Sequence, residues 1–77
     1  MLTSEQKNEL IKALCNYLDT RDKRFMFLKI LFPILAYKIN LEGSIKNTSW
    51  EIYNEFEKQE MLESLIMGLN NVFNLKL

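Results

Sequence analysis

The sequence predicts an all-α protein, and two observations carry that prediction. Apolar residues recur at a spacing near 3.6 in each segment long enough to judge, and hydroxyl residues that favour helix caps precede several of these segments. Only two glycines and one proline interrupt the 77 residues. We therefore expect residues 1–77 to form a single domain, a compact bundle of about five helices.

The first helix is expected over residues 4–18. Thr3 and Gln6 fit a capping box, in which the hydroxyl accepts a backbone N–H and the glutamine reaches back. A second helix should follow a cap at Asp19 and Thr20. Apolar residues nearly encircle this second segment, from Phe25 to Phe32, so we expect it to be the central helix, covered on several sides.

The second half should hold three further helices. Pro33 lacks a backbone N–H, so it should end the second helix and open a short one at about residues 34–39. A loop over residues 40–44 follows, in which Gly43 can take positive φ. Thr48 and Glu51 match a second capping box, which predicts a helix that ends near Lys58. The last helix has the clearest amphipathic stripe, formed by Met61, Leu62, Leu65, Ile66, Leu69, Val72 and Phe73.

The charges are sorted along the chain although the net charge is zero. Residues 1–39 carry an excess of three positive charges, and residues 40–77 an excess of three negative charges. If the halves fold onto opposite sides, one copy can dock head-to-tail on another through complementary surfaces. The expected basic surface consists of Arg21, Lys23, Arg24 and Lys29. The expected acidic surface consists of Glu51, Glu55, Glu57 and Glu63.

The composition argues against catalysis. The chain has no histidine, the residue most often used for general acid–base chemistry, and a single cysteine, Cys15, which we expect to be a small buried apolar residue. We therefore expect no enzyme activity, cofactor or metal site. No secretory signal opens the chain, and the apolar stretch from Phe25 to Ile39 is too short for a bilayer, so we expect a cytoplasmic protein.

Two alternatives to charged docking stay open. The cluster around Arg21 and Arg24 permits a small helical DNA-binding or regulatory protein, although zero net charge argues against binding to phosphates. In the other alternative the charges serve solubility and a partner binds an apolar groove near Trp50, which we otherwise expect to be buried. Charged docking would weaken with salt, whereas apolar docking would be nearly indifferent to it.

The order of several motifs resembles the effector-associated domains of bacteria, over residues 3–74. The motifs are Arg24-Phe25-x-Phe27-Leu28, Ile39-x-Leu41-x-Gly43-Ser44, a helix with Trp50, Ile52 and Tyr53, and Leu62-x-x-Leu65-Ile66-x-x-Leu69. The resemblance implies a death-domain-like fold and an adaptor role in bacterial defence signalling. It also implies the partners: another copy, or a similar domain that carries a caspase-like peptidase, a TIR domain, a nuclease or a nucleotide-driven switch protein.

Overall fold

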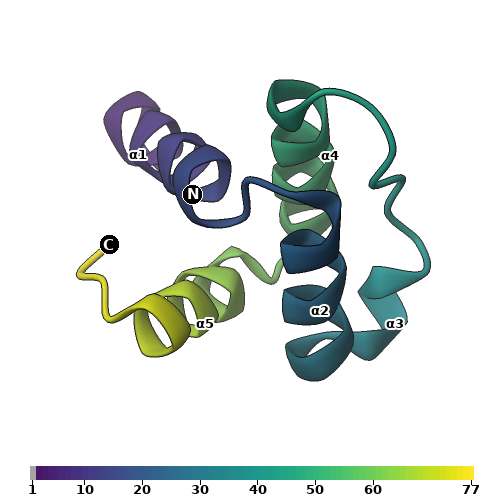
Figure 1. The fold of residues 1–77 in the computed structure, drawn as a ribbon. Helices are drawn as coiled ribbons and strands as arrows, with labels where there is room; N and C mark the ends of the chain where they lie inside the picture. The colour runs from purple at the N-terminus through teal and green to yellow at the C-terminus, as the bar shows by residue number, and fades with distance from the viewer. Residues whose placement is uncertain (1) are drawn as a thin grey trace.

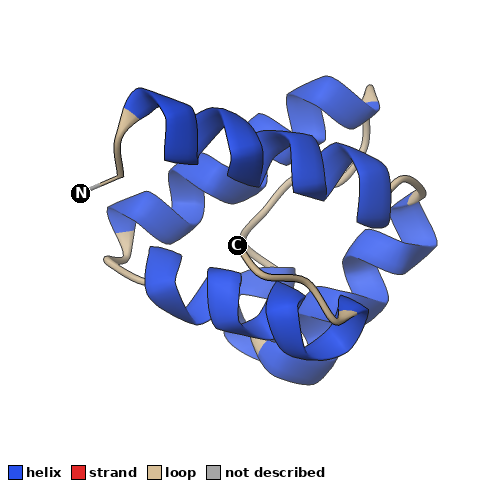
Figure 2. Ribbon diagram, turned by 90° about the vertical axis from the view of Figure 1, so that its left-hand side faces the viewer, coloured by secondary structure: helices blue, strands red, loops and turns tan. Residues whose placement is uncertain are grey.

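A computed structural model describes residues 2–77, and these residues form five helices and no strand (Figures 1 and 2). The helices are α1 (Ser4–Tyr17), α2 (Arg21–Leu31), α3 (Pro33–Ala36), α4 (Ile45–Lys58) and α5 (Leu62–Phe73). The prediction of an all-α bundle of about five helices is confirmed. None of the helices in the described residues combines the length and apolar character needed to cross a membrane.

The core lies among the helices, where α4 packs against both α1 and α5, and α2 packs against α3, which lies on the side of α2 away from α1 and α5 (Figure 1). Residues such as Leu14, Leu28, Ile52 and Leu65 are fully buried there. A row of aromatic rings in successive contact then links four of the helices, with centroids between 4.8 and 6.2 Å apart. The row runs through Tyr17, Phe73, Phe27, Phe32 and Phe56.

Local signals position the first helices as expected. The Thr3 hydroxyl accepts the Gln6 backbone N–H at 3.1 Å, and the Gln6 side chain accepts the Thr3 N–H at 2.9 Å. Thr20 caps α2 by accepting the Lys23 backbone N–H at 3.1 Å. Pro33 stands at the first position of α3, where its missing N–H costs no helical hydrogen bond.

The start of α4 was predicted wrongly. Ser44, not Thr48, is its N-cap and accepts the Asn47 backbone N–H at 3.1 Å. Thr48 lies one turn inside the helix, fully buried, and its hydroxyl donates to the Ser44 and Ile45 carbonyls. A hydroxyl inside a helix can bond back to a carbonyl one turn earlier, so the capping pattern alone did not mark the helix start. Helix α3 is also shorter than expected, because residues 37 and 38 form a turn and residue 39 a bend.

The second helix is not enclosed, contrary to the prediction. Leu28 and Phe27 face the core, but Met26 and Ile30 on the opposite side are exposed. Four other helices, one of them a single turn, supply too little surface to surround α2 completely. An apolar outer face therefore remains open to solvent.

Candidate functional site

An apolar surface on α2, α3 and α5 is the main exposed feature that packing does not explain. We call it the α2–α5 face. Its side chains and their exposed fractions are Met26 at 52%, Ile30 at 69%, Leu31 at 38%, Ile34 at 73% and Val72 at 53%. Exposed apolar residues are ordinary when scattered singly, but a contiguous group of them marks an interaction surface.

Two hollows connect these side chains. One, of about 260 Å³, lies between α2 and α5 and is lined by Phe27, Leu31, Val72 and Phe73. The other, of about 320 Å³, runs beside α3 and is lined by Leu31, Ile34 and other residues near them. Leu31 lines both hollows, so the two lie next to each other at this side chain. The α2–α5 face thus has raised side chains beside a groove.

Gly68 sets how closely α5 approaches α2 under this face. A Cβ atom placed on Gly68 would lie 3.2 Å from Cδ1 of Leu31 and 3.3 Å from Cζ of Phe27. Both distances are shorter than ordinary carbon contacts, so an added Cβ would require Leu31 and Phe27 to shift by a few tenths of an ångström, and a long side chain would not fit.

The expected basic surface is not assembled as predicted, because Arg24 is buried. This residue is 4% exposed, and its Nη1 donates to the Leu18 carbonyl at 3.0 Å. Leu18 is the C-cap residue of α1, whose last turn contains no basic residue of its own. The guanidinium therefore places a positive charge at the C-terminus of α1, where the helix dipole favours cations. Arg24 stabilises the α1–α2 turn and offers no charge to a partner.

The other basic residues are exposed but two of them are paired within the chain. Arg21 Nε lies 2.7 Å from Glu42 Oε1, and Lys23 Nζ lies 2.9 Å from Asp19 Oδ1. The hydrogen bond from Lys23 lowers the pKa of Asp19. Lys29 lies 5.7 Å from the ring centroid of Phe25, and Arg21 lies 6.0 Å from the same centroid. The structure thus brings Arg21 and Lys29 together around Phe25, and both ion pairs reduce the free positive charge.

The acidic residues lie on α4 and at the start of α5. Glu51, Glu57 and Glu63 are exposed, and Glu55 is half-buried and accepts from Gln59 Nε2 at 2.8 Å. Glu57 accepts the Tyr53 hydroxyl at 3.0 Å. Burial raises the pKa of Tyr53, and the hydrogen bond to Glu57 adds to the shift. A hollow of about 490 Å³ separates Glu57 from Glu63 and also touches Glu60.

Cys15 and Trp50 occupy the contact between α1 and α4. Cys15 is half-buried, and its Sγ donates to the Ser49 hydroxyl at 3.4 Å. Trp50 is half-buried and packs edge-on against Tyr53, with Lys7 Nζ about 5 Å from both ring centroids, at 5.2 and 5.1 Å. The lysine covers the aromatic pair, which does not favour the alternative of an apolar groove near Trp50.

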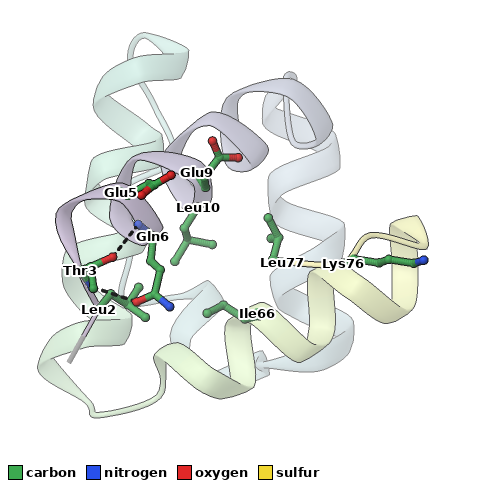
Figure 3. A pocket seen from close by; sticks show the side chains of 9 residues that line it. All are labelled: Leu2, Thr3, Glu5, Gln6, Glu9, Leu10, Ile66, Lys76 and Leu77. Atoms are coloured by element: carbon green, nitrogen blue, oxygen red, sulfur yellow. Dashed lines mark hydrogen bonds between the residues drawn. The ribbon is translucent and has the colours of Figure 1, made fainter.

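Another hollow, of about 480 Å³, opens between the start of α1 and the residues after α5 (Figure 3). Leu10, Ile66 and Leu77 form apolar walls, and Lys76 points away from the hollow (Figure 3). Of the polar residues that line it, Thr3 and Gln6 are committed to the capping box of α1, and Glu5 and Glu9 lie beside them on the same helix. In residues 2–77, no three histidine, cysteine or acidic side chains are grouped so that they could hold a metal ion.

The α2–α5 face was not predicted from the sequence, although the spacing of its exposed apolar residues indicates it. Met26 and Ile30 lie four residues apart on the side of α2 opposite its buried residues, and Ile34, four residues further along the chain, is exposed on α3. The apolar residues from Phe25 to Phe32 instead predicted that α2 is covered on several sides. Compared with known proteins, the chain matches no family model, no curated protein and no solved structure, so the resemblance to effector-associated domains rests on its motifs.

Proposed function

We propose that this chain is a cytoplasmic protein-interaction domain of the adaptor type, and that it binds its partner through the α2–α5 face. The observation that carries the proposal is the group of five exposed apolar side chains around a groove in a chain of only 77 residues. Leaving such side chains in water costs free energy, which a partner that covers them would recover at about 25 cal/mol per Å² of apolar surface.

The charged surfaces give weaker support for a docking role. Arg24 is buried, and Arg21 and Lys23 already have partners within the chain. Exposed ion pairs stabilise a protein by about 0.2 to 1 kcal/mol each, so a partner can displace them. They also reduce the electrostatic potential that would attract and orient a charged partner. We therefore place the contact on the apolar face and assign the charges to solubility and orientation.

The same pairings weigh against nucleic-acid binding. Affinity for nucleic acid depends on several free lysine or arginine side chains that neutralise phosphates. The chain has zero net charge, and the cluster around Arg21 and Lys23 carries Asp19 and Glu42 as counter-ions.

The resemblance to effector-associated domains extends the proposal to the recruitment of effectors in bacterial defence. In that role the domain would bring a tethered or separately encoded effector close to another. A peptidase, TIR domain, nuclease or nucleotide-driven switch protein encoded beside this chain would support the extension, and a neighbourhood without any of them would contradict it.

Photocrosslinking in the cells that produce the protein tests the proposal. A benzophenone amino acid at Ile34 should form an adduct with a discrete protein, which can be a second copy of this chain. The same amino acid at Asn54, an exposed position on α4 outside the face, is the matched control. Equal or absent crosslinking at the two positions would contradict binding through the α2–α5 face.

A further inference from the structure

We propose that the partner of the α2–α5 face is the same face of a second copy, related to the first by a two-fold axis. This inference rests on the proposed function and names its partner. In a two-fold contact the same patch meets itself, so the patch must be self-complementary in shape and free of unpaired like charges. The α2–α5 face has a ridge and a hollow that can serve as the two halves of such a contact, and its lining is uncharged apart from Lys23 and Lys38.

The shape condition follows from the raised side chains and the groove beside them. Met26 and Ile30 stand one turn apart on α2, and the hollow between α2 and α5 runs alongside them. Helices pack by seating the ridge of one in the groove of another. With a two-fold axis, the ridge of each copy enters the groove of the other, and both grooves are filled at once.

The charge condition follows from the pairing at the edge of the groove. Lys23 is the charged residue that lines the hollow between α2 and α5, and its ammonium group is held 2.9 Å from Asp19. Lys38 lines the hollow beside α3, at the outer end of the face. A face with so little free charge gives no electrostatic preference to a charged partner, and it does not repel itself. The net charge of zero removes general repulsion between copies as well.

The available area matches a weak dimer. The five exposed side chains of the face present roughly 500 Å² per copy, about a tenth of the 5177 Å² molecular surface. Two copies would bury about 1,000 Å² in total, near the lower limit for specific protein interfaces. We therefore expect a dissociation constant between about 1 μM and 1 mM.

Sedimentation equilibrium of the purified chain, from about 1 μM to about 1 mM, tests the inference. The expected result is a monomer–dimer equilibrium that stops at two copies and changes little between about 0.1 M and 1 M salt. A chain that stays monomeric at the highest concentration would overturn the inference. Oligomers larger than two would overturn the two-fold geometry, because a head-to-tail contact has no reason to stop at a pair.

Two variants locate the contact. Ile30→Glu places a charge on the face and should weaken the dimer at least tenfold. Met67→Glu is the matched control, because Met67 is also an exposed apolar residue but lines neither hollow of the face. Circular dichroism should show both variants folded, since both positions are exposed. Equal weakening by the two variants, or none, would overturn the assignment to this face.

The outcomes also separate this inference from the proposed function. The purified chain could be monomeric while position 34 crosslinks to a different protein in cells. The chain would then still be an interaction domain, but the inference that its partner is a second copy would be wrong. If neither association is seen, both proposals fail.

Discussion

The Arg24 guanidinium donates a hydrogen bond to the Leu18 carbonyl at 3.0 Å and closes the turn between α1 and α2 from inside the protein. A residue that the charge pattern assigned to a docking surface is therefore part of the structural core. Replacing Arg24 should therefore change the stability of the fold and not the contact with a partner.

We expect Arg24→Ala to lower the free energy of unfolding by about 1 to 3 kcal/mol, because the buried Leu18 carbonyl loses its partner and the guanidinium leaves a gap. Urea denaturation followed by circular dichroism measures the loss. Lys29→Ala, on the exposed side of the same helix, is the control and should change stability by less than about 0.5 kcal/mol. Equal effects at the two positions would show that the guanidinium is not held inside.

Replacing the cap of α4 tests where that helix begins. Ser44→Ala should destabilise the protein by about 1 kcal/mol, because the Asn47 backbone N–H loses its acceptor. Ser44→Asp retains an acceptor and should stay close to the wild-type stability. Thermal unfolding compares the three proteins, and an alanine variant as stable as the aspartate variant would argue against a cap at this residue.

Gly68 should tolerate alanine far better than leucine. The alanine Cβ gains up to about 1 kcal/mol in helix propensity, which offsets the small displacement of Leu31 and Phe27. Leucine cannot fit between α5 and α2, so Gly68→Leu should cost about 1 to 3 kcal/mol. Chemical denaturation gives both values. A leucine variant as stable as the alanine variant would mean that the two helices are not in close contact.

Tyr53 should make stability fall at high pH. Its pKa is raised in the folded protein by burial and by the hydrogen bond to Glu57, so the folded state holds the phenol proton more tightly than the unfolded state. The stabilising contribution is complete below the unfolded pKa of about 10 and is lost as the pH rises through the folded value. Denaturation midpoints between pH 8 and pH 12 should be measured for the protein and for Tyr53→Phe. The difference between the two midpoints should be constant near pH 8 and should change only in the alkaline range. Parallel curves would exclude the linkage.

Asp19 provides a local check on the ion pair with Lys23. The carboxylate should titrate at a lower pH than an aspartate in a short peptide, because the Lys23 hydrogen bond favours its charged form. Its contribution to stability is present above the unfolded pKa and is lost as the pH falls through the folded value. NMR titration of the Asp19 carboxyl carbon measures the midpoint. Lys23→Met should raise it, and an unchanged midpoint would show that the pair does not form in solution.

The helices were largely predictable because their signals are local. The capping box at Thr3, the cap at Thr20 and the break at Pro33 each depend on a few neighbouring residues, and all three appear in the structure. The start of α4 was predicted wrongly because Ser44 and Thr48 are both hydroxyl residues, and both form hydrogen bonds with nearby backbone groups. A helix capped by Ser44 begins with Ile45, which lies seven residues before Ile52 and therefore near the same side of the helix.

The candidate site was less predictable because it depends on which faces meet. Arg24 precedes Phe27 and Leu28 by three and four residues, a spacing that places all three on one side of α2. The pattern alone allows a charged residue in an apolar stripe to be either exposed or buried. The hydrogen bond from Arg24 to the Leu18 carbonyl explains why this one is buried. The exposure of Ile30 and Ile34 likewise follows from how few helices are available to cover them.

Trp50 is the single tryptophan of the chain, and Lys7 of α1 lies over its ring on α4. Its fluorescence therefore monitors the pairing of the first and fourth helices and should change when the protein unfolds. The indole is not among the residues of the α2–α5 face, so its emission should remain constant when two copies associate. An intrinsic optical probe thus separates loss of the native state from assembly in the same sample.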